Sequence, residues 1–232
     1  MLFNRNVLKR DAIISAFLTF LFALAGSVFN IITYAQSGSG ANAKSYFMSN
    51  LLLNIGMIVD VLVIAIAFLR NDKKTAFVAA LMGMPLYGGA VLFSNVDMFT
   101  DGTYAALDFW PLGLALVEYM VIAVCILEAF VYVLIHLIKG KANPKFSPAQ
   151  NTEAASIILA FVVVLWMIPA FKQPDIWKST ELWSNLLSLC GEIALVETFA
   201  STLFLCDEPT LQKGKIEPKE SAEANAEDGA AK

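Results

Sequence analysis

Six long apolar segments follow one another along this sequence and leave little chain for any other kind of core. They are residues 12–34, 47–69, 75–94, 111–138, 154–171 and 183–206. A helix needs about 20 apolar residues to cross a hydrocarbon core of about 30 Å, and each segment has or approaches that length. The sequence therefore predicts an all-α integral membrane protein, a six-transmembrane-helix bundle forming one domain over residues 1–206. The composition agrees, because 58% of the residues are hydrophobic and only 16% are charged, against about a quarter in soluble domains.

The lysines and arginines predict the orientation of this bundle. With the N-terminus inside, the cytoplasmic segments hold 13 of the 16 basic residues, and only Lys44, Lys172 and Lys178 lie outside. Cytoplasmic flanks collect positive charge, and tryptophans anchor at the membrane interface. All 4 tryptophans fall at or near the predicted outer boundary. We therefore expect an N-in, C-in protein, located in a bacterial cytoplasmic membrane.

The two ends of the chain differ from its apolar middle. Residues 207–232 are rich in charge and almost free of large apolar side chains, so we expect a disordered, charged cytoplasmic tail. At the other end, the basic residues before position 11 and the triplet Ala23-Leu24-Ala25 also fit a cleaved signal within residues 1–25. Because the apolar run continues to Tyr34, a retained first helix is the favoured interpretation.

The third apolar segment contains four residues that weaken a helix. They are Gly83, Pro85, Gly88 and Gly89. Proline removes a backbone donor and clashes with the preceding turn, so we expect a kink or a hinge here. Two interpretations follow: the glycines permit close packing between helices, or a broken helix lines a site, where freed backbone groups meet protein or water.

Carboxylates inside the apolar segments are the strongest chemical signal in the chain. Five of them lie there, namely Asp60, Glu118, Glu128, Glu192 and Glu197. A charged side chain at the centre of a membrane helix costs roughly 2.5 to 3.5 kcal/mol on the insertion scale. No lysine or arginine lies within any of the six segments. These carboxylates must therefore be protonated, bound to a cation, hydrogen-bonded, or paired with another protein.

The five carboxylates differ in their predicted depth within the membrane. Asp60, Glu128 and Glu197 each lie ten or eleven residues from the predicted inner boundary, which is roughly 15 Å and close to the midplane. The sequence thus predicts a layer of three carboxylates. Glu118 falls on the outer side. Glu192 is rotated by about 140° from Glu197 on an ideal helix, so the two cannot point at one centre.

Several polar side chains are candidate partners for this acidic layer. Asn54 and Tyr87 lie within apolar segments and can hydrogen-bond to a carboxylate. A protonated glutamate can also serve only as a hydrogen bond between helices. Cys125 and Cys190 are either small apolar fillers or soft metal ligands. The sequence leaves the identity of any metal or cofactor open.

These features favour one class of function over two others. We expect membrane transport of a small solute, as a transporter or its substrate-binding subunit, with a midplane acidic site for a proton, metal ion or cationic organic ligand. The alternative is a non-catalytic accessory subunit whose acids pair with basic residues of a partner. An enzyme is not expected, because a serine or metal hydrolase would need more than His136, the single histidine. Nor does the charge predict a nucleic-acid partner.

In helix number, size and orientation the chain resembles the substrate-capture subunits of energy-coupling-factor vitamin transporters. Ala12 and Ala16 also match the small-xxx-small pattern that such subunits present on their first helix. The resemblance implies a partner membrane subunit. Because the sequence contains no nucleotide-binding fingerprint, a separate ATPase module would drive the transport.

Overall fold

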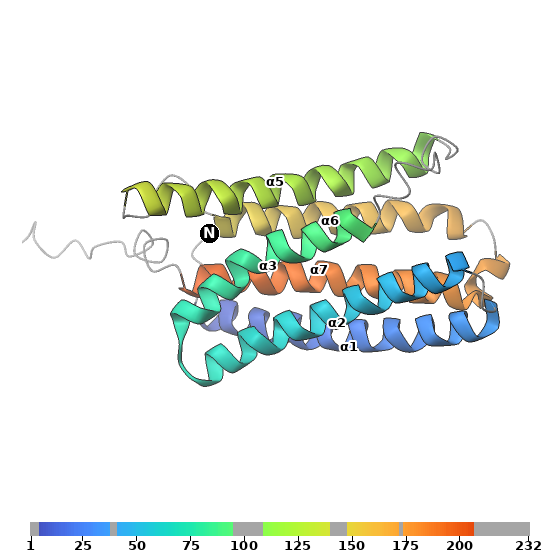
Figure 1. Ribbon diagram of the computed structural model, residues 1–232, viewed down its shortest axis with the longest axis horizontal. Coiled ribbons are helices and arrows are strands. Elements are labelled where there is room, and N and C mark those ends of the chain that lie inside the picture. Colours follow the sequence, from blue (N-terminus) through green and yellow to red (C-terminus); the bar gives the residue numbers. More distant parts are fainter. Residues whose placement is uncertain (1–4, 38–40, 95–108, 140–147, 172–173, 207–232) are drawn as a thin grey trace, which may run out of the picture.

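The computed structural model describes residues 5–37, 41–94, 109–139, 148–171 and 174–206 (Figure 1). Regular structure in this part of the chain is entirely helical: α1 Arg5–Ser37, α2 Ala41–Leu69, α3 Lys73–Ser94, α5 Phe109–Lys139, α6 Pro148–Phe171, the short 3-10 helix η2 Pro174–Lys178, and α7 Thr180–Cys206. Each apolar segment predicted above lies within one of the α-helices. The predicted tail, residues 207–232, lies outside the described residues.

Three helices are long and apolar enough to cross a membrane within the described part of the chain. Their candidate spans are Val7–Gln36, Phe47–Leu69 and Thr180–Cys206. Two shorter apolar helical stretches, Tyr119–Ile135 and Ala149–Leu165, add to the apolar character. The all-helical fold and these spans indicate a membrane protein.

The turn between α2 and α3 shows how local chemistry sets a helix boundary. Asn71 adopts a φ of 56°, a left-handed conformation that asparagine tolerates better than most residues. The next residue caps α3: the backbone N–H of Thr75 donates to Asp72 Oδ1 at 3.0 Å, and Thr75 Oγ1 donates to Asp72 Oδ2 at 2.6 Å. Such a cap satisfies a donor that the first helical turn leaves free. α3 therefore starts at a fixed point.

α7 is the central helix of the bundle. It packs against α1, α6, α3 and α2, while α1, α2, α3, α5 and α6 pack in that order around it. In the most apolar window of α7, 67% of the residues are buried, against 28% in α1 and in α2. α1 and α6 both flank α7 but do not pack closely against each other. The ring of helices is therefore open on one side, along the seam between α1 and α6.

The helices alternate in direction along the bundle axis (Figure 1). The start of α1, the turn from α2 to α3, the end of α5, the start of α6 and the end of α7 lie at the same end, on the left of the view. Consequently α2, α5 and α7, which carry the five carboxylates of the apolar segments, run in one direction.

α3 continues as an α-helix through Pro85, so the described chain has no break there. Two of its glycines lie at close helix contacts. A methyl group on Gly83 would overlap the ring of Phe199 on α7, and one on Gly88 would lie 2.6 Å from Ile122 Cγ2 on α5. Gly89 has nothing within 4 Å of an added Cβ. These contacts support the close-packing interpretation for Gly83 and Gly88, and a hinge at this segment stays a prediction.

α1 and α7 meet through small and hydroxyl-bearing residues. Thr198 Oγ1 lies 3.1 Å from Ser15 Oγ, and Ser184 Oγ donates to the carbonyl of Gly26 at 3.4 Å. Small residues let membrane helices approach closely, and hydroxyl groups then hydrogen-bond between them. Ala12 is buried and Ala16 packs on the same core. The small-residue pair of α1 therefore contacts the bundle itself.

Candidate functional site

A groove runs along the open seam between α1 and α6, with α7 as its floor. Its volume is about 410 Å³, and its lining comes from all three helices: Ser15, Leu18 and Phe22 of α1, Ser156, Ile157 and Ala160 of α6, and Cys190, Ile193, Ala194 and Glu197 of α7. We call it the seam groove. Most of this lining is apolar, and Glu197 is its one ionisable carboxylate. The seam groove is thus a mostly apolar groove with a single carboxylate in its described lining.

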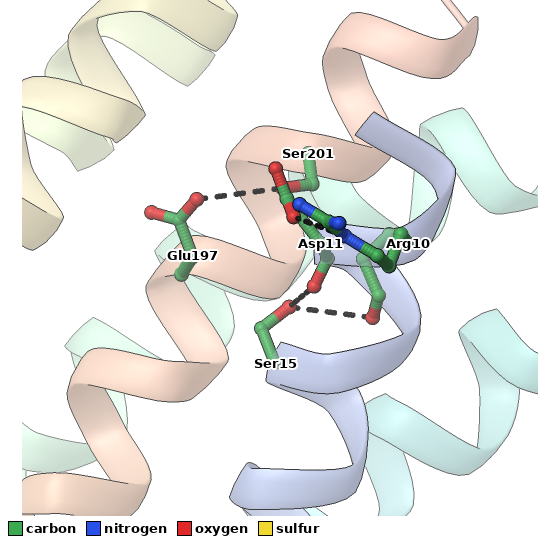
Figure 2. Close-up of polar contacts among 6 residues, drawn as sticks. Arg10, Asp11, Ser15, Glu197 and Ser201 are labelled. Atoms are coloured by element: carbon green, nitrogen blue, oxygen red, sulfur yellow. Dashed lines mark hydrogen bonds and ion pairs between the residues drawn. The ribbon is translucent and has the colours of Figure 1, made fainter. Parts of the chain in front are cut away.

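Glu197 is held by serines from two helices. Ser156 Oγ of α6 donates to Glu197 Oε2 at 2.8 Å, and Ser201 Oγ, one turn further along α7, donates to Oε1 at 3.5 Å. Figure 2 shows Glu197 projecting from α7, with Ser15 of α1 nearby. Both serines are almost fully buried, whereas Glu197 is only partly buried. The two serines therefore orient the Glu197 carboxylate, and its other side is accessible from the groove.

A second carboxylate lies close to the first. Glu153, one turn before Ser156 on α6, is near enough to Glu197 for their negative charges to repel each other. The carbonyl of Glu153 also accepts a hydrogen bond from Ser156 Oγ at 2.9 Å. The sequence analysis missed Glu153 because the fifth apolar segment was counted from residue 154, and it missed Ser156 because nothing local to that segment pairs a serine with Glu197. The signal was a glutamate and a serine three residues apart at its start.

The end of the seam groove nearest the start of α1 carries opposite charges. Arg10 Nε lies 3.6 Å from Asp11 Oδ1, and both side chains are exposed. Ser15 Oγ donates to the carbonyl of Asp11 at 2.8 Å (Figure 2). Because α1 and α7 run in opposite directions and Ser15 contacts Thr198, Asp11 comes level with the end of α7.

Glu192 faces a different helix. Tyr87 OH of α3 donates to Glu192 Oε1 at 2.9 Å, and Tyr87 is itself buried. The structure thus brings two of the predicted site residues together. It also turns Glu192 toward α3 and Glu197 toward α6, as their separation of about 140° on an ideal helix requires.

Asn54 lies on a third side of α7. Its side chain is fully buried, and Ser188 Oγ donates to Asn54 Oδ1 at 3.2 Å. Asn54 Nδ2 has no hydrogen-bond partner among the described residues. Asn54 therefore forms no hydrogen bond with those predicted carboxylates whose side chains the structure describes.

Of the remaining predicted carboxylates, only Asp60 has a described side chain, and it does not line the seam groove. Asp60 is half-buried on α2 and has no hydrogen-bond or ion-pair partner among the described residues. Glu118 and Glu128 lie on α5, but their side chains fall outside the described part of the structure. α5 packs against α3 and α6 and not along α7. The layer of Asp60, Glu128 and Glu197 stays a prediction.

The seam groove presents one carboxylate, which accepts hydrogen bonds from two serines. Among the described residues, no group of three or more histidine, cysteine, aspartate or glutamate side chains could hold a metal ion. The cysteines at 125, 190 and 206 form no disulfide with one another. Comparisons of the chain with protein families, with curated proteins and with solved structures found no match. The geometry of the seam groove is therefore the basis for a functional proposal.

Proposed function

We propose that the chain is a six-span membrane protein that binds and transports a small organic cation through the seam groove, with Glu197 as the charged binding residue. The observation that carries the proposal is the position of Glu197, which lies in an apolar groove between two helices that do not pack on each other. Besides its hydrogen bonds from Ser156 and Ser201, a carboxylate in such surroundings is stabilised by a positive partner. No lysine or arginine lines the groove in the described part of the chain. A bound cation supplies that partner.

The size and lining of the groove favour an organic cation over a metal ion or a proton alone. Ligand sites for small molecules have volumes of about 300–1,000 Å³ and are mostly apolar, with few polar groups. The seam groove, at about 410 Å³ with a mostly apolar lining, fits that description. An ammonium group would bond to Glu197, and an apolar body would lie against Leu18, Phe22 and Ile193.

Binding at Glu197 can be coupled to a movement of α6. Ser156 joins α6 to Glu197 on α7 through one hydrogen bond of 2.8 Å. A ligand ammonium would compete with Ser156 for the carboxylate, and its charge would also lessen the repulsion between Glu197 and Glu153. Both changes alter the balance of forces between α6 and α7. We propose that α6 moves relative to α7 during transport.

The proposed orientation places the start of α1 and the end of α7 in the cytoplasm. It is supported by the basic residues of the described segments, because Lys9, Arg10, Arg70, Lys73 and Lys74 belong to the end of the bundle where α1 starts. Such an excess of positive charge is typical of the cytoplasmic side.

Binding of defined cations to the purified protein in detergent tests the proposal. Benzyltrimethylammonium and tetraphenylphosphonium serve as probes, and a neutral hydrocarbon of similar shape serves as the control ligand. We expect the cations to raise the melting temperature. Glu197→Gln should weaken cation binding about tenfold, which corresponds to about 1.4 kcal/mol, because it removes the negative charge that pairs with the cation.

Glu192→Gln is the matched control, since Glu192 lies on the same helix but faces Tyr87. Asp60→Asn and Glu128→Gln then test whether the predicted layer takes part. Equal binding by the wild type and Glu197→Gln would overturn the proposal. If no cation binds and a partner protein is instead lost on Glu197→Gln substitution, the accessory-subunit alternative is correct.

A further inference from the structure

The seam groove has a polar end and an apolar end. Its polar lining residues Ser15, Ser156 and Glu197 lie toward the end of the bundle at which α1 and α6 start and α7 ends (Figure 1). From Glu197 the groove continues along α7 to Cys190, seven residues earlier in the chain, which is about 10 Å on an ideal helix. The side chains that line this length are apolar and come from all three helices: Leu18, Phe22, Ala160 and Ile193.

Both rims of the seam groove are exposed and apolar. On α1, Ile14 and Leu21 border the lining residues and are 48% and 45% exposed. On α6, Ile157 lines the groove and is 53% exposed, and Phe161, one turn further along, is 66% exposed. Exposed apolar side chains on a membrane-spanning helix face lipid tails. The open side of the seam groove therefore faces the hydrocarbon of the bilayer.

This polarity matches that of an amphiphile in a membrane leaflet. Such a molecule holds its charged head toward the water and its chain toward the midplane. In the seam groove, the carboxylate of Glu197 likewise lies toward one end of the bundle, and the apolar lining continues from it along the bundle axis. A cationic head would form a charge-assisted hydrogen bond with Glu197, and each methylene group of the chain that is buried against the apolar lining adds affinity.

We propose that the seam groove admits amphiphilic amines sideways from the bilayer, with the ammonium group bound to Glu197 and a single alkyl chain lying along the groove toward Cys190. The ligand passes between the rims of α1 and α6, the two helices that do not pack closely on each other. This inference rests on the proposed function, because it names the class of cation and the route by which that cation enters.

A series of alkyl chains tests the class of ligand. The affinities of tetramethylammonium, butyltrimethylammonium and octyltrimethylammonium are measured by titration of the full chain in lipid nanodiscs. Nanodiscs with the Glu197→Gln variant give the blank for partitioning of each cation into the lipid. We expect octyltrimethylammonium to bind at least about tenfold more tightly than tetramethylammonium, because its chain is buried against the apolar lining.

One pair of variants tests whether the chain lies in the seam groove. Ala160→Leu adds bulk to the apolar end of the groove, whereas Ala154→Leu makes the same substitution at an exposed position of α6 outside the lining. We expect Ala160→Leu to lower the ratio of octyltrimethylammonium to tetramethylammonium affinity several-fold, and Ala154→Leu to leave that ratio unchanged. An equal ratio in both variants would overturn the proposed position of the chain.

A spin label at the rim tests the sideways opening. The label is attached to Ile157→Cys in a chain whose three cysteines are replaced by alanine, and its accessibility to oxygen, which dissolves in lipid, is compared with that to a water-soluble nickel complex. Lys178→Cys, at an exposed position of η2, is the aqueous control. We expect label 157 to favour oxygen and label 178 to favour nickel. Greater access of nickel to label 157 would show a water-filled mouth, and low access of both probes would show a mouth covered by another protein; either result would overturn the proposal.

The chain series separates this inference from the proposed function. If the three cations bind equally and all lose affinity in Glu197→Gln, the seam groove binds small cations and the inference of an amphiphilic ligand is wrong. If none of them binds to the wild type, the proposed function and this inference are both wrong.

Discussion

Glu192 and Glu197 are the same residue type, five positions apart on one central helix, yet they lie in different surroundings. Glu192 accepts a hydrogen bond from Tyr87 across the contact between α3 and α7, where Gly83 brings α3 against the ring of Phe199. Glu197 accepts its bonds from Ser156 and Ser201 at the edge of an open groove. Helical rotation separates the two carboxylates, and the neighbouring helices then decide what each can do.

The difference teaches how a buried carboxylate in a membrane protein is to be interpreted. A glutamate whose partner comes from a closely packed helix acts as a hydrogen bond that joins two helices. A glutamate at a seam between helices keeps one side available to a ligand. The first should matter for stability and the second for binding, and the following predictions test that division.

The largest expected effect on stability comes from closing the space at Gly83. In Gly83→Ala the new methyl group overlaps the Phe199 ring, and overpacking of this kind costs about 1–3 kcal/mol. The free energy of unfolding in detergent measures it. Gly89→Ala is the control, because nothing lies within 4 Å of an added Cβ there, and alanine in a helix is about 0.5–1 kcal/mol more favourable than glycine. Equal stability of the two variants would contradict the close contact of α3 with α7.

Tyr87→Phe should have the next largest effect on stability. It removes the hydroxyl that donates to Glu192 at 2.9 Å and leaves the ring in place. Hydrogen bonds between membrane helices average about 0.6 kcal/mol and reach about 1.7 kcal/mol, so we expect a loss of about 1 kcal/mol. A double-mutant cycle with Glu192→Gln isolates the coupling between the two side chains. Cation affinity should stay unchanged, and a loss of affinity would place Glu192 in the binding site.

Ser156→Ala should affect stability less and binding more. Its hydroxyl donates to Glu197 at 2.8 Å, but an opened carboxylate can be hydrated from the groove, so we expect a loss of about 0.5 kcal/mol. Because a ligand ammonium competes with Ser156, cation affinity should rise by a few-fold. Titration of benzyltrimethylammonium measures this change. A several-fold fall in affinity would show that Ser156 orients Glu197 for the ligand instead.

The helices and their rotation were predictable from the sequence, because both depend on local properties. An apolar run long enough to cross a membrane must form a helix, since every backbone group needs a partner within it. The divergence of Glu192 from Glu197 follows from 3.6 residues per turn. Neither result requires knowledge of which helices are neighbours.

The partners of each glutamate were not predictable, because they depend on the packing order of helices far apart in the sequence. Nothing local to α7 pairs Glu192 with Tyr87, which is 105 residues away. The same holds for Ser156 and Glu197.

Glu153 was missed for another reason: α6 starts at Pro148, where proline suits the first helical turn, so the helix extends well before its apolar part. The close contacts of Gly83 and Gly88 became known only with their neighbours Phe199 and Ile122, and the hinge stays a prediction.

The smallest expected effect concerns Asp72, a carboxylate in full contact with water at the start of α3. Hydrogen bonds from the side chain and backbone of Thr75 hold the pKa of Asp72 below its ordinary value of 3.8. A carboxyl group with a lowered pKa in the folded state stabilises the protein above its unfolded pKa, and that stability is lost as the pH falls through the folded value. We expect the difference in stability between the wild type and Asp72→Asn to be constant near neutral pH and to shrink below pH 3.8.

Thr75→Val removes the hydroxyl bond but keeps the backbone one, so it should raise the pKa of Asp72 toward its ordinary value, as NMR titration of the carboxyl carbon can show. If Asp72 titrates at or above 3.8 in the wild type, the cap does not hold in solution, and the position of α3, and with it that of Tyr87 against Glu192, must be fixed by packing alone.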